Sequence, residues 1–365
     1  MKITGVTQHH VSEPLDGTFY PTWIPGYPQG SHEAEVFEIE TDEGITGVTA
    51  SPSFAGGIEY ETPLQLFLLG EDPHDVEGIL RKLESIHTLG PRSWHIELAL
   101  WDIIGKDAGK PVYELLGGTG DPIQAYASTG MVLDAEERIE YVEERVEEGF
   151  DAVKLRITER EDVEMVREVR EAFPDLTLMV DANKGWMVTV MDEEPVWTVT
   201  EAIQVARELE PLDITWLEEP LPRHNYEGYA RLREATDVPI AGGEFNHGVD
   251  QLYQFLDHGA LDVLQPDAAL ATGIRRATEV AGAARQQGVE FVPHTWTNAI
   301  GFAANMHVMA AVDGRWCEFP HDSPWTPEAW GTIIEEQFTV EDGAVTPPEK
   351  PGLGVDLDRS VLEDS

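Results

Sequence analysis

The sequence is poor in cysteine and in long apolar runs, and each shortage excludes a class of protein. A single cysteine, Cys317, excludes an internal disulfide framework. No apolar run approaches the length of a membrane span, and residues 1–11 lack the long apolar core of a signal peptide. We therefore expect a cytoplasmic protein that has no membrane partner.

Basic residues are also scarce. The chain has 69 Asp and Glu against 24 Lys and Arg, of which only 7 are lysine, so its formal net charge is −45. Binding of nucleic acid needs clustered Lys and Arg to neutralise phosphates, so this composition argues against a nucleic-acid partner. The acidic residues are spread along the whole chain. This composition resembles that of proteins from salt-accumulating haloarchaea, whose surfaces carboxylates keep soluble.

The length of 365 residues and the 41% hydrophobic content predict a large barrel or two domains with a packed core. From residue 123 onward, short apolar runs alternate with amphipathic stretches. Eight strand-like runs separated by seven helical stretches predict a parallel (β/α)7β TIM-like barrel. The runs are IQAYAS, DAVKLRI, LTLMVDAN, DITWLEE, VPIAGGE, LDVLQPD, VEFVPH and GRWCEF. The repeats share no residue-level similarity, which argues against a solenoid.

The segments on either side of this pattern differ from it. Residues 1–122 mix strand-like and helical stretches and predict an α+β capping domain, whereas residues 123–318 form the predicted barrel. Residues 319–365 are rich in proline and irregular, and we expect them to pack back on the capping domain. The aromatic, Pro- and Gly-rich stretch 18–31 is interpreted either as a rigid surface loop or as a lid over the barrel mouth.

Three carboxylates follow three consecutive strand-like runs. Asp181, Glu218 and Glu244 each close an apolar run, at the strand ends where a barrel places its active site. One such residue alone is more often a helix cap or a solvated residue, but three in register form the hard oxygen set that Mg²⁺ prefers. Glu219 directly follows Glu218 and is expected to lie behind the ligands.

The next two runs end in Asp267 and His294. A carboxylate beside an imidazole orients it and supports its protonated form, so this pair is a candidate general base. The alternative is an isolated buried histidine whose ring nitrogens form hydrogen bonds with backbone groups. Glu318 ends the eighth run, and strand alternation turns its neighbour Cys317 toward the helices, where we expect it to be inert.

Lys154 and Arg156 lie two residues apart in the second run, so they point to the same side of a strand. They are either counter-ions of the carboxylates or groups that act on the substrate. Because lysine is so rare in this chain, Lys154 is predicted to have a chemical role.

Several motifs in this order together resemble the enolase superfamily, in its mandelate racemase-like branch. They are ELALWDIIGKDAGKPVYELLGG, VDANKGW, WLEEP, VPIAGGE, LQPDAALATGI and VPHTW. The resemblance implies Asp181, Glu218 and Glu244 as Mg²⁺ ligands. It also implies Asp267–His294 as the catalytic dyad and Glu318 as a hydrogen-bond donor to the substrate carboxylate.

Two departures from the family pattern bear on the reaction. The second basic residue of the pair is usually a lysine base, but here it is Arg156, whose guanidinium stays protonated near neutral pH. Some sugar-acid dehydratases of the family have a histidine where this chain has Asn183. An additional segment, residues 187–197, is predicted to lean over the site or to meet a neighbouring subunit.

We therefore predict a Mg²⁺-dependent sugar-acid dehydratase that takes an aldonate or an aldarate. Lys154 and Arg156 are expected to stabilise the substrate carboxylate or the enediolate. The alternatives are a racemase or epimerase that uses Lys154 with His294, and a non-catalytic metal-binding barrel. Assembly as a homo-oligomer, a dimer or an octamer, is expected from the family. Predicted substrate contacts are Phe19, Tyr20, Trp23, Tyr27, residues 51–54, Asn183 and His247.

Overall fold

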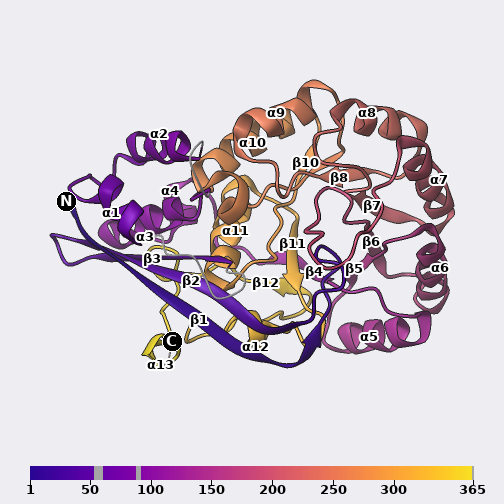
Figure 1. The fold of residues 1–365 in the computed structure, drawn as a ribbon, viewed down its shortest axis with the longest axis horizontal. Helices are drawn as coiled ribbons and strands as arrows, with labels where there is room; N and C mark the ends of the chain where they lie inside the picture. Colours follow the sequence, from indigo (N-terminus) through magenta and orange to yellow (C-terminus); the bar gives the residue numbers. More distant parts are fainter. Residues whose placement is uncertain (53–60, 88–91, 364–365) are drawn as a thin grey trace.

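The computed structural model describes residues 1–52, 61–87 and 92–363, and it shows a small domain packed against a curled parallel sheet (Figure 1). The small domain has a three-stranded antiparallel sheet in the order β1-β2-β3. Its elements are β1 (Ile3–Phe19), β2 (Gln29–Thr41), β3 (Thr46–Pro52), α1 (Glu61–Leu68), α2 (Val76–Ile86), α3 (Ile96–Ala108) and α4 (Val112–Leu115). Helix α3 packs on β3 and ends at Gly109, whose φ of 65° is the left-handed conformation that glycine adopts most easily.

The second domain contains the eight predicted parallel strands. They are β4 (Ile123–Ser128), β5 (Ala152–Arg156), β6 (Thr177–Asp181), β7 (Ile214–Glu218), β8 (Ile240–Gly242), β9 (Val263–Leu264), β10 (Glu290–Phe291) and β11 (Trp316–Pro320). The hydrogen-bonded order is β10-β9-β8-β7-β6-β5-β4-β11, so among the described residues no ladder joins β10 to β11. The predicted α/β barrel is confirmed, with this one seam in its sheet.

Seven helices lie between these strands in the fully described stretch 123–320 and cover the outside of the sheet (Figure 1). They are α5 (Ala135–Glu147), α6 (Val163–Ala172), α7 (Val199–Leu209), α8 (Tyr226–Ala235), α9 (Gly248–Asp257), α10 (Ile274–Gln286) and α11 (Ala299–Val312). The helix N-caps are residue types that commonly begin helices. Asp134 accepts a hydrogen bond from the Glu137 amide at the start of α5, and Thr198 with Glu201 forms a capping box on α7.

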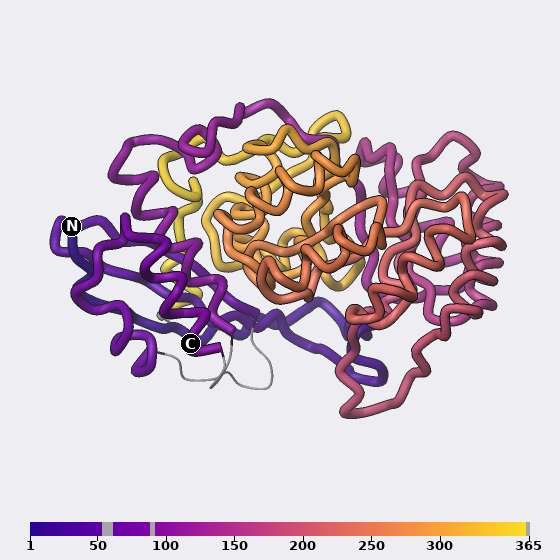
Figure 2. The backbone as a smooth tube through the Cα atoms, turned by 90° about the horizontal axis from the view of Figure 1, so that it is seen from above, coloured from indigo at the N-terminus to yellow at the C-terminus, as the bar shows by residue number. Residues whose placement is uncertain are grey.

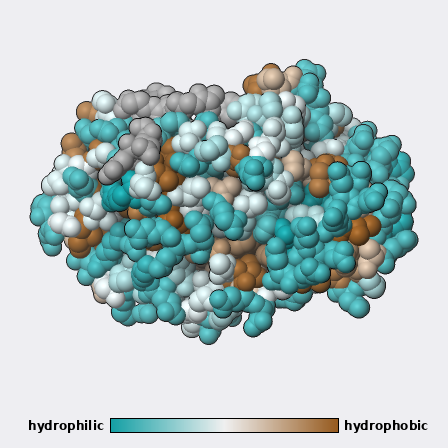
Figure 3. All heavy atoms as spheres, turned by 90° about the horizontal axis from the view of Figure 1, so that it is seen from below, coloured by the Kyte–Doolittle hydropathy of each residue, from teal (hydrophilic) through white to brown (hydrophobic). Residues whose placement is uncertain are grey.

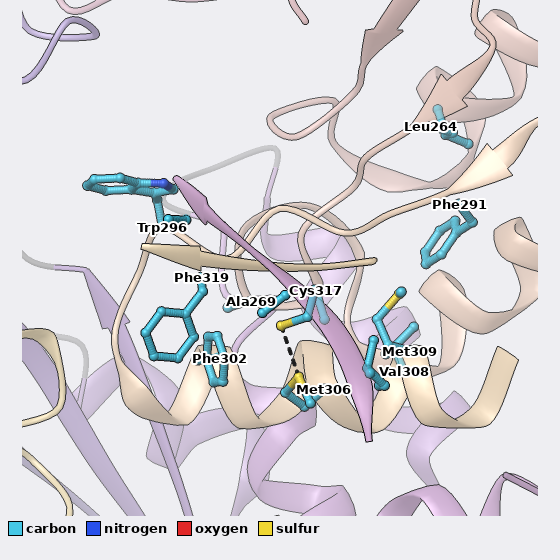
Figure 4. Close-up of a cluster of buried hydrophobic side chains, with 14 of the residues drawn as sticks. Leu264, Ala269, Phe291, Trp296, Phe302, Met306, Val308, Met309, Cys317 and Phe319 are labelled. Atoms are coloured by element: carbon cyan, nitrogen blue, oxygen red, sulfur yellow. Dashed lines mark hydrogen bonds between the residues drawn. The ribbon is translucent and has the colours of Figure 1, made fainter. Parts of the chain in front are cut away.

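Helix α11 is buried almost all round and fills the space between the barrel and the small domain. The predicted orientation of Cys317 is confirmed here. Its buried thiol points at α11 and lies 3.1 Å from Sδ of Met306 (Figure 4). Burial raises the pKa of this thiol well above its ordinary value, which keeps it protonated and unreactive.

The C-terminal segment contacts both domains. It contains α12 (Pro327–Trp330), β12 (Ala344–Val345) and α13 (Arg359–Glu363). The Leu353 amide donates to Asp102 on α3, and Arg359 pairs with Glu38 on β2. However, β12 also pairs antiparallel with β4, a barrel contact that the sequence did not suggest. The division at residues 122 and 318 stays a proposal that these element bounds fit.

The described residues contain no helix that is both long and apolar enough to cross a membrane.

Candidate active site

Strand alternation builds the floor of the site. One inward-facing residue from each strand, or directly after it, forms an apolar layer: Tyr126, Ala152, Met179, Trp216, Ala241, Val263, Val292 and Trp316. Side chains two residues further along a strand point to the same side. At those positions stand the polar residues Ser128, Lys154, Asp181, Glu218, Gln265, His294 and Glu318. The apolar layer therefore supports the polar layer from below.

The three predicted metal ligands converge. Asp181 ends β6, Glu218 ends β7 and Glu244 follows β8 by two residues, and all three are buried. One oxygen atom from each lies within 4.8 Å of the others. Oxygens on opposite sides of a Mg²⁺ ion are roughly 4 Å apart, so this cluster has about the dimensions of a magnesium site.

The electrostatics of the cluster also fit a divalent cation. Oε1 of Glu244 accepts a hydrogen bond of 2.6 Å from Nε1 of Trp186, but among the described residues Oε2 has no hydrogen-bond partner. Burial raises the pKa of Glu244, and burial also raises the pKa of Asp181 to about 7 against the opposing charge of Arg156. Buried carboxylates whose pKa values are raised in this way would be stabilised in their charged form by a divalent cation, and an all-oxygen set suits Mg²⁺.

Lys154 lies beneath this cluster. Its Nζ is 2.9 Å from both oxygens of Glu218 and 2.6 Å from Glu318, and the side chain is fully buried. Burial opposes the charged amine, but the Glu218 and Glu318 carboxylates raise the pKa of Lys154 above its ordinary value. Lys154 does not line the cavity described below.

Glu318 accepts hydrogen bonds from its described neighbours. Ser128 Oγ donates to one oxygen at 2.8 Å and the Thr295 amide donates to the other at 2.9 Å, in addition to the Lys154 contact. The donor role that the family resemblance implies for Glu318 therefore stays a prediction, and the present contacts do not support it.

Arg156 takes the place opposite His294 in the mouth of the barrel. Its Nη1 donates to Asp181 and, at 2.7 Å, to Oδ1 of Asn183. The guanidinium carbon lies 5.6 Å from the ring of Trp23 and 5.7 Å from that of Trp296, within cation–π range. Arg156 is thus fixed by a carboxylate, an amide and two aromatic rings.

The predicted dyad is formed. Nδ1 of His294 lies 2.9 Å from Oδ2 of Asp267, while Oδ1 of Asp267 accepts the Ala269 amide at 2.7 Å. Nε2 of His294 lies 3.6 Å from Glu244. Burial lowers the pKa of His294, but the Glu244 charge and the Asp267 hydrogen bond outweigh it and raise the pKa to about 9. The fixed Nδ1 leaves Nε2 as the atom that can exchange a proton with a ligand.

A cavity of about 640 Å³ opens above these residues, between the barrel and the small domain. The predicted contacts Trp23, Tyr27, Ser51, Asn183 and His247 line it. Other expectations are not met. Tyr20 does not line the cavity and is 53% exposed, and Phe19 is fully buried beneath Trp23. The predicted contacts Ser53 and Phe54 lie outside the described residues.

The loop between β1 and β2 reaches the barrel mouth, as the lid interpretation of residues 18–31 predicts. The Thr22 amide donates to the Gly130 carbonyl at 3.0 Å, and Thr22 Oγ1 donates to Asn183 at 2.5 Å. Segment 187–197 lies against this loop, since the Val188 amide donates to the Trp23 carbonyl at 2.9 Å. Figure 2 shows the tip of the indigo hairpin beside this segment, so the segment leans over the lid.

Several residues of the site were not predicted from the sequence. Trp186 donates to the carboxylate of Glu244, and Gln265 donates to Glu218 at 2.9 Å. Gly185 is required because a Cβ there would lie 2.2 Å from the carboxyl carbon of Glu219. Trp186 and Gly185 both belong to the VDANKGW motif, so proximity to Asp181 could have found them. Arg92 and His95 line the cavity from the small domain, where no motif marks them.

Two family models match the chain. The enolase C-terminal domain-like model covers residues 137–361, and the mandelate racemase/muconate lactonizing enzyme N-terminal domain covers residues 29–117.

Several relatives match this chain over nearly its whole length. D-galactarolactone cycloisomerase of Agrobacterium fabrum is 33% identical over 99% of this chain and 98% of its own. Arabinonate dehydratase of Saccharolobus solfataricus is 30% identical, covering 93% and 92%. The L-talarate dehydratase of Polaromonas sp. JS666, solved with Mg and L-glucarate, superposes with a TM-score of 0.83 at 28% identity, covering 99% and 96%.

Proposed function

The chain belongs to the enolase superfamily, in its mandelate racemase/muconate lactonizing enzyme branch, and on this basis we propose that it is a Mg²⁺-dependent dehydratase of a sugar acid. The reaction would remove the proton α to the carboxylate and the β-hydroxyl, with net loss of one water, to give a 2-keto-3-deoxy acid. Relatives named as sugar-acid dehydratases support this reaction, although another relative is a cycloisomerase.

One observation carries the choice of dehydratase over racemase. Of the two basic positions on β5, only Arg156 reaches the cavity, whereas Lys154 is buried beneath the carboxylates. A racemase needs a proton acceptor on each face of the substrate carbon, and a guanidinium is a poor acceptor near neutral pH. The cavity therefore offers one convincing base, His294, which suits a one-sided elimination.

Each residue has a definite task in this scheme. Asp181, Glu218 and Glu244 would hold Mg²⁺, which when bound supplies positive charge that makes an α-proton acidic enough to remove. In its neutral form, Nε2 of His294 accepts the α-proton while Asp267 holds the ring. Mg²⁺ held by Glu244 would offset the carboxylate charge that raises the pKa of His294, and so would favour this neutral form. His294 can then return that proton to the departing β-hydroxyl, which leaves as water. Arg156 stands opposite His294 and stabilises the negative charge on the substrate.

The alternatives make different predictions. An epimerase would need Lys154 to move into the cavity from its contacts with Glu218 and Glu318. A non-catalytic barrel would have no use for an anchored Asp267–His294 pair beside the metal ligands.

The experiment incubates the protein with Mg²⁺ at molar KCl and a library of aldonates, aldarates and the D-galactarolactone used by the cycloisomerase relative. We expect a 2-keto acid that is detected as its semicarbazone. Exchange of the α-proton with solvent deuterium in the absence of keto product would favour the epimerase. Isomerisation of the lactone alone would favour a cycloisomerase. The absence of product and of proton exchange with every compound would favour the non-catalytic barrel.

A further inference from the structure

The cavity has two walls, and the proposed chemistry uses only one of them. The barrel wall presents His294, Glu244 and Arg156. The opposite wall comes from the small domain and includes Arg92 and His95, which precede or begin α3. The proposed dehydration assigns no role to this second wall.

Arg92 has no counter-ion in the part of the chain that the structure describes. Among residues 1–52, 61–87 and 92–363 it forms no ion pair, and other surface arginines without an ion pair there, such as Arg231 and Arg315, do not line the cavity. Partial burial and the neighbouring cation Arg223 lower the pKa of Arg92, and no carboxylate of the described residues offsets them. In a chain with a net charge of −45, a guanidinium that lines a cavity without a carboxylate partner among the described residues is a candidate site for an anionic ligand.

His95 supplies a second, independent observation. The residue is only 4% exposed and lines the cavity, yet its Nε2 has no hydrogen-bond partner among the described residues. Burial lowers the pKa of His95 to about 3, so the ring is neutral and Nε2 can donate or accept. Buried polar atoms are nearly always paired, so an unpaired one that faces a cavity indicates a ligand or water partner.

His247, on the barrel side, lines the same cavity as Arg92 and His95. Its Nδ1 is also buried without a partner in the described chain. A Cβ on the next residue, Gly248, would lie 3.7 Å from the ring of Trp94, directly before His95. Two imidazole nitrogens and a guanidinium that lack partners among the described residues therefore border one part of the cavity, from two segments of the chain that are distant in sequence.

We propose that Arg92, His95 and His247 form a subsite for a terminal anionic group of the substrate, at the end remote from the carboxylate beside the reacting carbon. The substrate class is then a sugar acid with two anionic ends, an aldarate rather than an aldonate. The proposal rests on the proposed function, which needs the first carboxylate at the barrel wall. Glu33 also lines the cavity and suits the sugar hydroxyls between the two ends.

The charge of the whole molecule makes such a subsite necessary for a dianion. A surface with a large excess of carboxylates repels a doubly charged substrate more strongly than a singly charged one. Molar salt screens this repulsion beyond about 3 Å but leaves direct contacts intact. A guanidinium at the entrance provides the planar pair of donors that a carboxylate accepts.

The test measures binding in the His294→Asn variant, so that the result does not depend on turnover. Calorimetry with Mg²⁺ and molar KCl compares sugar acids that differ only at carbon 6, galactarate with galactonate and glucarate with gluconate. We expect tighter binding of at least one aldarate than of its partner. In the same background, Arg92→Gln should weaken aldarate binding about tenfold and aldonate binding less than about twofold.

Two further variants sharpen the result. Arg231→Gln removes one positive charge from an exposed position on α8 that does not line the cavity, and it should leave both affinities unchanged. Arg92→Lys should retain part of the preference, because it keeps the charge but not the planar fork. An equal loss for aldarates and aldonates in Arg92→Gln, or no loss, would overturn the subsite.

A separate experiment tests the chemical nature of the terminal anion. A 6-phosphoaldonate that binds more tightly than glucarate, with the larger loss in Arg92→Gln, would overturn the assignment to a dicarboxylate. Failure of the proposed function would show instead as absence of keto acid from the wild-type protein, whatever the binding preference of the variant.

Discussion

At the scale of single residues, the position of Arg156 bears most directly on the proposed reaction. The guanidinium donates to Asp181 and Asn183 and lies between Trp23 and Trp296, so it is rigidly held opposite His294. A fixed, permanently charged group can stabilise a developing anion without rearrangement, but it cannot accept a proton.

The substitution Arg156→Lys tests this division of labour. An amine at this position can titrate, so we expect the variant to exchange the α-proton from the face opposite His294 and to form a trace of the epimer. Dehydration should slow about tenfold, because the amine cannot reproduce the planar donor set of the guanidinium. Proton NMR in deuterium oxide measures both. Exchange from this second face in the wild-type protein would contradict the role of Arg156.

His294→Asn should remove the base while leaving the metal site in place. We expect kcat for keto-acid formation to fall about a thousandfold, the range attributed to general base catalysis. Mg²⁺ affinity measured by calorimetry should change little, because the carboxylates are untouched. Retained turnover would refute the assignment of His294, and a parallel loss of Mg²⁺ binding would point to damage of the site instead.

At the scale of secondary-structure elements, the junction of α3 with α10 ties the two domains together. Glu97 on α3 is fully buried, and its Oε1 accepts the Arg275 amide in the first turn of α10 at 3.0 Å and Nε1 of Trp101 at 2.9 Å. Among the described residues its Oε2 has no partner. Burial raises the pKa of Glu97 to about 7.

This carboxyl should make stability depend on pH. The folded-state pKa lies above the ordinary value of 4.5, so the fold favours the neutral acid. Its contribution is therefore fully present below pH 4.5 and is lost as the pH rises toward 7. Glu97→Gln removes this titration, so the variant should gain stability relative to wild type between pH 5 and 8, by about 3 kcal/mol at most. Denaturant unfolding at both pH values measures the difference, and a pH-independent difference would contradict it.

At the scale of the whole molecule, the acidic composition governs behaviour in solution. Figure 3 shows a face that is largely hydrophilic, with apolar residues in small separate patches. With 69 acidic and 24 basic residues, the carboxylates repel one another across the surface, and repulsion favours expansion. A source in a salt-accumulating haloarchaeon and assembly as a dimer or octamer both stay predictions.

Salt should therefore stabilise the fold. Raising KCl from 0.1 M to 2 M shortens the screening length to a few ångströms, and we expect the thermal midpoint to rise by about 10 °C or more. Sucrose at equal osmolality serves as the control, because it is excluded from the surface without screening charge. A midpoint that is independent of KCl would contradict the electrostatic explanation.

Much of this molecule follows from local sequence patterns. The alternation of apolar runs and amphipathic stretches predicted all eight barrel strands, because strand and helix periods are properties of short segments. The period of two along a strand also placed Lys154 and Arg156 on one side and turned Cys317 toward the helices. The convergence of Asp181, Glu218 and Glu244 was predicted because parallel strands bring their carboxyl ends to one edge.

Other features required the tertiary structure. Lys154 and Arg156 look equivalent in sequence, but only the depth of each position in the barrel shows that one is buried under carboxylates and the other faces the cavity. Likewise, Tyr20 and Trp23 belong to the same aromatic loop, yet the path of the loop turns only Trp23 toward the site.

The sequence by itself determined the order of the strands, the chemistry at their ends and the charge of the surface, since these depend on residue type and local spacing. The tertiary structure alone decided which residues of the small domain face the barrel. Arg92, His95 and His247 line one cavity only because the small domain packs against the barrel, and contacts between distant segments leave no periodic signal in the chain.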